Sequence, residues 1–114
     1  MAKCCWRVKD KGIAMKINDI LAKYKIDYRP VGRIICKDGF SMSVQAGDTL
    51  YCSPRSNQGP WDEVEVGFPS HEDKDLLQYA ERPNHPVDTV YAYVPVALVE
   101  SVMEKHGGFD RVES

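Results

Sequence analysis

Apolar and polar residues follow two different periods along the chain, and together they predict an α+β domain. An i, i+3, i+4, i+7 spacing that begins at Ile17 predicts a short amphipathic helix, and Pro30 prevents its continuation. Strict alternation, or β-branched and aromatic enrichment, predicts strands at 33–36, 40–45, 50–52, 64–68 and 89–94. We therefore expect an antiparallel sheet of about five strands with two or three helices.

The residues between these segments predict how the strands connect. Asp38-Gly39 lies between two apolar runs, which is a strong hairpin signal. With turns at 46–48 and 53–60, three successive hairpin links predict an antiparallel meander. A helix is predicted over 71–80, with Ser70 as N-cap and Asp73 at the capping-box position. A last helix should follow Pro95 and end at Gly107-Gly108.

Length and composition fit one domain. The chain has 114 residues, of which 43% are hydrophobic and 28% are charged, as in ordinary globular domains. Residues 1–14 are polar and basic and predict an N-terminal extension, whereas residues 15–114 predict a single ligand-binding domain. No apolar run approaches the ~20 residues of a membrane span and no secretory signal is evident, so we expect no membrane partner.

Charge is distributed unevenly along the chain. Residues 1–37 hold ten Lys or Arg and three Asp or Glu, whereas residues 38–114 hold five and fourteen. In one interpretation the two parts attract one another, within a chain or between protomers. In the other, the basic part forms an anion site from Lys23, Lys25, Arg29, Arg33 and Lys37. Long nucleic acid is not an expected partner, because the acidic remainder would repel its phosphates.

The sequence contains no convincing set of catalytic or metal-binding residues. The three histidines lack a ligand spacing, and no phosphate-binding glycine loop occurs. The cysteines form no C-x-x-C pair, so we expect reduced thiols, with Cys36 and Cys52 as small core residues. Cys52 with His85 is a conceivable dyad, but a buried structural cysteine is the better interpretation. We predict a protein that is not an enzyme and needs no cofactor.

Binding chemistry is concentrated between Tyr51 and Ser70. The loop at 53–60 carries Arg55 and two amides, Asn57 and Gln58, and Trp61 follows at its exit. Arginine can hold a phosphate, and amides can read a base edge or a hydroxyl. A second rigid loop presents Asn84 between two prolines, and Tyr91 and Tyr93 are predicted on one side of the last strand, either in the core or as a stacking platform.

Three runs resemble a known family. They are KDGFSMSVQAGDTLYCSPR (37–55), VEVGFPS (64–70) and DTVYAYVPVALVESVMEKHGG (88–108), within a resemblance that spans roughly 17–108. These runs are similar to the first type of phage Thoeris anti-defence protein, a molecular sponge. The resemblance implies a protein that binds a cyclic ADP-ribose isomer made by bacterial TIR-type defence enzymes and does not cleave it. It also implies homodimers or hexamers, sites for other cyclic nucleotides, and action in the host cytoplasm during infection.

Chemical reasoning within the matching region assigns provisional roles to seven residues. Arg55 is the predicted phosphate ligand, with Arg29 and Arg33 as additional cations. Phe68, Tyr79 or Tyr91 would stack on adenine, and Asn84 would make a polar contact. Two rival functions remain: a protein-binding inhibitor of a bacterial nuclease or effector that uses acidic residues 62–75, and a small nucleotide-degrading enzyme.

Overall fold

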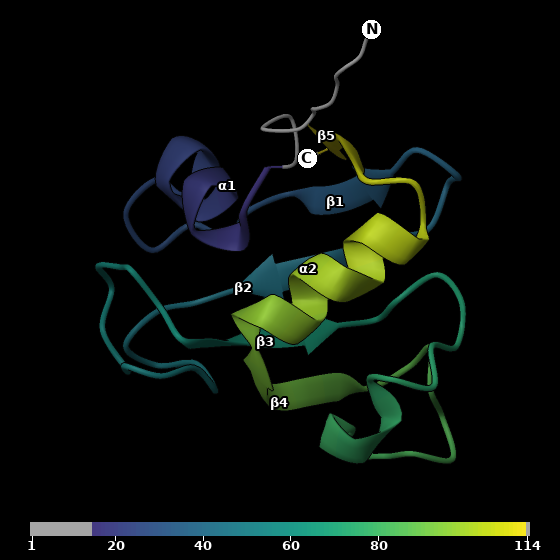
Figure 1. Ribbon diagram of the computed structural model, residues 1–114. Coiled ribbons are helices and arrows are strands. Elements are labelled where there is room, and N and C mark those ends of the chain that lie inside the picture. The colour runs from purple at the N-terminus through teal and green to yellow at the C-terminus, as the bar shows by residue number, and fades with distance from the viewer. Residues whose placement is uncertain (1–14, 114) are drawn as a thin grey trace, which may run out of the picture.

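The computed structural model describes residues 15–113, which form a five-stranded antiparallel sheet with both α-helices on one face (Figure 1). The strands are β1 (Arg33–Cys36), β2 (Ser41–Gln45), β3 (Glu63–Gly67), β4 (Val90–Pro95) and β5 (Phe109–Glu113), in the spatial order β4-β3-β2-β1-β5. The helices are α1 (Ile17–Tyr24), α2 (Val96–Lys105) and a 3₁₀ turn, η2 (Leu77–Tyr79). The predicted α+β class is confirmed. The predicted extension at 1–14 lies outside the described residues.

The core fills the space between the sheet and the two helices. Alternate strand residues point into it and are fully buried, among them Ile34, Met42, Val44, Val64 and Val66. Each helix contributes one apolar stripe: Ile17, Ile20 and Leu21 from α1, and Val99, Val102 and Met103 from α2. The opposite face of the sheet is only half-buried and largely polar, as expected for an antiparallel sheet with one covered face.

The predicted strand at 50–52 is wrong. Residues 46–62 form one long connection between β2 and β3, and it meets the sheet at the isolated bridge between Ser53 and Glu63 and at Tyr51 O, which accepts from Tyr93 N–H over 3.1 Å. The Cys52 thiol is buried and bonds to the backbone of Gly47, with Gly47 N–H donating over 3.3 Å and the thiol donating to Gly47 O over 3.0 Å. These local bonds fold 47–52 back on itself, and β3 takes the place beside β2.

The predicted helix at 71–80 is reduced to the short η2 turn. Ser70 does not cap a helix, because its backbone N–H and its hydroxyl both pair with the backbone of Ser41. The Asp73 carboxylate is divided between a local and a tertiary bond: Oδ1 accepts from Asp75 N–H over 3.0 Å, and Oδ2 lies 2.9 Å from Lys105 Nζ of α2. A tertiary bond therefore replaces the predicted cap at Ser70, and Asp73 does not complete a capping box with it.

β4 and β5 depart from the regular alternation of inward and outward residues, and this explains two further differences between the predicted and the observed strands. The register of β4 shifts opposite β3 between Val64 and Val66, so Tyr91 is fully buried whereas Tyr93 is 39% exposed. The prediction that these tyrosines share a side is therefore wrong. β5 was not predicted, because a similar shift opposite Ile35 and Cys36 places its inward residues, Phe109 and Val112, three positions apart.

A cluster of charged side chains ties the C-terminus of α2 to two loops. We call it the α2 clasp: Asp38, Asp73, Lys105 and His106. His106 Nδ1 lies 2.8 Å from Asp38 Oδ2, and its ring stacks on Phe40 with centroids 4.0 Å apart. The backbone N–H of Phe40 and then His106 lower the pKa of Asp38. Burial acts to raise the pKa of Asp73, but hydrogen bonds from Lys105 and the Asp75 backbone outweigh it, and the pKa is lowered.

No helix in the part of the chain that the structure describes has the length and apolar character needed to cross a membrane.

The clasp predicts an acid-sensitive contribution to stability. Asp73→Asn should lower the free energy of unfolding at neutral pH by about 1–3 kcal/mol, because a buried acceptor for Lys105 loses its charge. The folded-state pKa of Asp73 is lowered, so ionisation stabilises the fold above about pH 4 and the stabilisation is lost as pH falls through the folded pKa. Urea denaturation should therefore show that the difference in free energy of unfolding between variant and wild type becomes smaller in acid. Asp48→Asn, in an exposed turn, is the control; equal losses in both variants would contradict the role of the clasp.

Candidate functional site

The connection 46–62 packs beside α1 and the segment that leaves it, and a cleft forms between them. We call it the α1–loop cleft: α1 and segment 25–30 on one side, and Gln45 with segment 47–61 on the other. Two side-chain amides hold these segments in place, and a third lies between them.

Asn18 fixes the end of the loop to α1. Its side-chain Nδ2 donates to Trp61 O over 2.9 Å, and its Oδ1 accepts from Trp61 N–H over 2.7 Å. This reciprocal pair imitates one step of a β-ladder. Trp61 is buried and its indole N–H donates to Ser56 O, so the loop turns back over its own tryptophan.

Gln45 fixes the other side of the cleft in the same manner. Its Oε1 accepts from Val31 N–H over 2.8 Å, and its Nε2 donates to Val31 O over 2.7 Å. Because Gln45 belongs to β2, this pair holds the segment before β1 against the sheet. Because Val31 directly follows residues 25–30, β2 thereby fixes the end of that segment.

The cleft has two lobes that share two residues. The larger cavity, about 620 Å³, includes Trp61 and Gln58 in its lining and is called the tryptophan lobe. The smaller, about 260 Å³, includes Tyr28, Arg29 and Thr49 and is called the arginine lobe. Lys25 and Asn57 line both. The larger volume falls within the range of about 300–1,000 Å³ that is typical of small-molecule sites.

Asn57 carries a buried oxygen without a hydrogen-bond partner. Its Nδ2 donates to Asp27 O over 3.2 Å, which fixes the orientation of the amide. Its Oδ1 is buried and accepts no hydrogen bond from the described residues. An unpaired buried acceptor costs about 1–3 kcal/mol, and such groups in native proteins often belong to functional sites.

The charges of the arginine lobe favour an anion. Lys25 and Arg29 both line it, and none of its lining residues is acidic. The ring of Tyr28 is 72% exposed at the rim, where it offers a flat face to a ligand. A phosphate beside two cations with an aromatic face nearby is a combination found in nucleotide sites.

Of the seven residues that were assigned ligand-binding roles from the sequence, Arg29 alone lines the arginine lobe; Lys25 and Asn57, which were named from the sequence as binding candidates, line it too. Arg55 is exposed in the loop at 53–60, close in sequence to Asn57, and lines neither lobe. Arg33 lies on the open face of the sheet, where its Nη2 donates to Phe68 O over 2.7 Å. The Phe68 side chain is 47% exposed, so these two predicted residues meet outside the cleft.

The remaining three predicted residues gather near the β4 edge. Tyr91 is fully buried and its hydroxyl donates to Pro86 O over 2.6 Å, so its ring has no face open to a ligand in this conformation. Tyr79 is half-buried in η2 and packs against the core, and Asn84 is exposed in the 81–88 loop. The seven predicted residues thus occupy four places and do not form one site within a single chain.

Sequence reasoning did not single out Asn18 or Gln45, and it named Lys25 only as one cation among several. Asparagine is unfavourable inside helices, so Asn18 in α1 carried a weak signal for a tertiary role. Lys25 directly follows α1, and no pattern indicated that its side chain would enter a cleft. Its position depends on a loop that packs from 20 or more residues away, as the bond between Asn57 and Asp27 illustrates.

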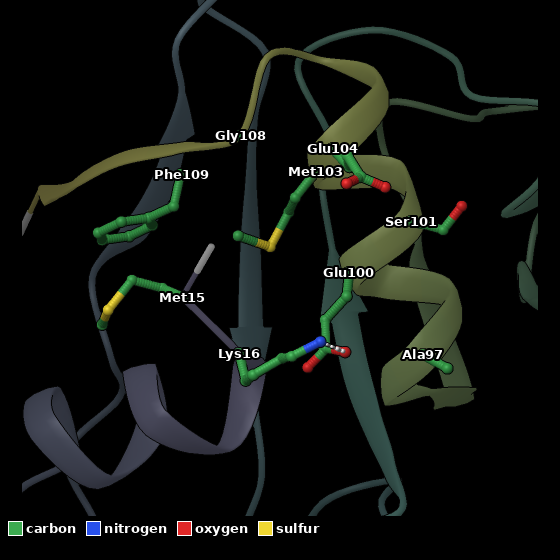
Figure 2. A pocket seen from close by; sticks show the side chains of 9 residues that line it. All are labelled: Met15, Lys16, Ala97, Glu100, Ser101, Met103, Glu104, Gly108 and Phe109. Atoms are coloured by element: carbon green, nitrogen blue, oxygen red, sulfur yellow. Dashed lines mark ion pairs between the residues drawn. The ribbon is translucent and has the colours of Figure 1, made fainter. Parts of the chain in front are cut away.

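A second cavity, about 330 Å³, lies between α2 and the residues before α1 (Figure 2). Met15, Met103 and Phe109 form an apolar wall, and Glu100 faces Lys16 across the opening. Glu100 already accepts from Ile17 N–H over 2.8 Å and lies 3.8 Å from Lys16 Nζ. The carboxylate therefore caps α1, for which Lys16 supplies no side-chain bond, and we assign this cavity a structural role.

Within residues 15–113, no group of three His, Cys, Asp or Glu side chains is arranged to hold a metal ion. Cys36 and Cys52 are free and buried, as predicted. Burial, followed by the nearby Asp38 charge, raises the pKa of Cys36 to about 11.

The Asn18 pair predicts that one amide controls the order of the loop. Asn18→Ala should lower the free energy of unfolding by about 1–3 kcal/mol, because both backbone groups of Trp61 lose their partner. Hydrogen exchange of the Trp61 amide should accelerate more than that of β2 or β3 amides. Asn84→Ala, which removes an exposed amide, is the control. Exchange that accelerates uniformly over the whole chain would contradict a local role.

Comparisons of the chain with protein-family models, curated proteins and solved structures find no match. A proposal for the function therefore rests on the cleft and on the family resemblance of the three sequence runs.

Proposed function

We propose that this protein binds and sequesters, without cleaving it, a cyclic ADP-ribose isomer made by bacterial TIR-type defence enzymes. As a phage anti-defence protein, it would act in the host cytoplasm and starve a defence effector of its signal. The observation that carries the proposal is the α1–loop cleft, in which Lys25 and Asn57 line both a cavity of small-molecule size and the adjoining arginine lobe, and Arg29 lines the arginine lobe. The sequence resemblance supplies the ligand class, which also extends to other cyclic nucleotides.

The chemistry of such a ligand matches what the cleft offers. A pyrophosphate requires cations, and a guanidinium can hold two of its oxygens at once. Adenine requires a flat partner, and the exposed ring of Tyr28 at the rim is suited to stacking. Ribose hydroxyls require acceptors and donors, which amide side chains supply. A sponge must compete with an effector, so we expect a nanomolar dissociation constant, which corresponds to a binding free energy of about −12 kcal/mol.

The proposal includes assembly of two or more copies, as homodimers or hexamers. Ile26 and Tyr28, two positions apart in the segment that leaves α1, are 57% and 72% exposed, and we place the contact between copies at this segment. A second chain packed over Ile26 would leave Tyr28 at the mouth of the cleft and could bring Arg55, Arg33 or Phe68 of one copy near the cleft of another. That arrangement would unite residues that lie apart within one chain.

Two other functions compete with sequestration. Acidic mimicry by residues 62–75 is weakened by the ion pairs that hold Asp73 and Asp75 to Lys105. A nucleotide-degrading enzyme would use the same cleft, so only the fate of the ligand separates it from a sponge.

A capture-and-release experiment tests the proposal. The purified protein is incubated with a TIR-derived cyclic ADP-ribose isomer, filtered, and heated to release what it holds. We expect the unaltered isomer in the released fraction by mass spectrometry. An altered nucleotide would indicate an enzyme, and a filtrate that retains all the ligand would leave the protein-binding function as the better account.

Removal of single cations should weaken capture to different extents. Arg29→Ala should raise the dissociation constant about 10–100-fold, because a charged hydrogen bond contributes about 1.5–3 kcal/mol. Arg55→Ala should weaken capture less, since Arg55 is exposed outside both lobes. Arg82→Ala, an exposed arginine in the 81–88 loop, is the matched control for isothermal titration. Equal affinity in all three variants would remove Arg29 and Arg55 from the proposed site.

Self-association predicts a mass above that of one chain in solution. Light scattering should give at least twice the 12.9 kDa of the monomer, and Ile26→Asp should shift the mass toward one chain. Val87→Asp, an exposed apolar residue in another loop, is the control. A wild type that remains at one chain mass at high concentration would contradict the assembly.

A further inference from the structure

We propose that Lys25 and Asn57 act together as the element that recognises a phosphorylated ribose. Lys25 Nζ would hold the anionic group, and Asn57 Oδ1 would accept a hydrogen bond from a sugar hydroxyl beside it. The inference rests on the proposed function and names the part of the ligand that the cleft reads.

Lys25 and Asn57 occupy the boundary between the lobes, since each lines both cavities. Gly47 shows how close they come to one another. A Cβ added to Gly47 would lie 3.3 Å from Asn57 Oδ1 and 3.8 Å from Lys25 Nζ. A cation and an unpaired acceptor therefore face the same small volume above one glycine. A ligand that reaches this point meets both groups.

The unpaired oxygen requires a donor rather than another acceptor. Asp27 O accepts from Asn57 Nδ2, so the amide cannot be turned round without placing two oxygens against one another. Of the other amides that line the cleft, Asn18 and Gln45 have both ends satisfied by backbone groups, and Gln58 is exposed. Asn57 is thus the cleft amide whose acceptor is both buried and unpaired, and a hydroxyl or amino group would restore the missing bond.

Lys25 is the group that can move to admit that donor. Its side chain is half-buried and flexible, and it lies over Gly47 together with the buried Oδ1. An anionic group in the arginine lobe, which has Arg29 on its lining and no acidic lining residue, would attract the ammonium group. Movement of Lys25 toward the anion leaves the space at Oδ1 to the ligand. In a ribose phosphate the phosphate and a hydroxyl are close neighbours, so one ligand can satisfy both groups.

The experiment separates the two halves of this element with two ligands. The cyclic ADP-ribose of this experiment is the TIR-derived isomer, which offers phosphates and hydroxyls, whereas inorganic pyrophosphate offers the anion alone. Both are titrated into the wild type and variants by calorimetry, with circular dichroism and thermal unfolding as checks of the fold.

Lys25→Gln should weaken both ligands at least about tenfold, as expected for a lost charged hydrogen bond. Lys23→Gln removes an exposed lysine two positions away on α1 and should leave both affinities unchanged. Gly47→Ala keeps the amide bonded to Asp27 but places a methyl group against Oδ1, so it should weaken cyclic ADP-ribose while pyrophosphate binds within about twofold of the wild type. Gly67→Ala, where a Cβ meets only ordinary contacts, is the matched control.

The outcomes distinguish this inference from the proposed function. If the wild type captures cyclic ADP-ribose but Lys25→Gln and Gly47→Ala behave like their controls, the recognition element is overturned and sequestration stands. If Gly47→Ala weakens both ligands equally, the selective role of Asn57 is overturned. If the wild type binds pyrophosphate alone, the proposed function fails, and the comparison of Lys25→Gln with Lys23→Gln still decides the anion subsite. Binding of neither ligand would overturn both proposals.

Discussion

The cleft exists because side-chain amides substitute for backbone partners. A connection as long as 46–62 cannot satisfy its peptide groups by pairing with strands, and it would otherwise be free to move. Asn18 and Gln45 each supply a donor and an acceptor to one backbone residue, and so attach the two walls of the cleft to α1 and to β2. These two contacts, with the bond from Asn57 Nδ2 to Asp27 O, fix the cations and Asn57 relative to one another, and the order of the site therefore follows from ordinary hydrogen-bond satisfaction.

The charge arrangement of the folded chain differs from the simple contrast seen along the sequence. Some acidic residues of the C-terminal part pair with cations of the same part, as Asp73 and Asp75 do with Lys105. Lys25 and Arg29 from the basic part line a cavity without an acidic lining residue. Of the two interpretations of the uneven charge, the pair of Lys16 and Glu100, 3.8 Å apart, fits attraction between the two parts, and the lining of the arginine lobe fits an anion site.

The sequence allowed the sheet to be predicted wherever its pattern was regular. β1, β2 and β3 alternate cleanly, and Asp38-Gly39 connects the first two as the turn signal indicates. α2 ends where the paired glycines predict, with Gly108 N–H bonded to Met103 O. The prediction failed for β4 and β5, where the strand register shifts. At such a bulge, inward-facing residues are spaced three positions apart instead of two. The site was harder to predict than the sheet. Arg29 and Asn57 were named from the sequence, but no local pattern indicates that Lys25 lies beside them.

The buried thiols provide the molecule with two natural reporters of local opening. Cys52 bonds to the backbone of Gly47, which lines the arginine lobe, whereas Cys36 lies in the core next to the Asp38 turn. A thiol reagent reaches a buried cysteine only when the structure around it opens, so the labelling rates of these two sulfurs measure local opening in two separate regions. Motion beside the cleft could thus be followed separately from motion near the Asp38 turn, without an attached probe.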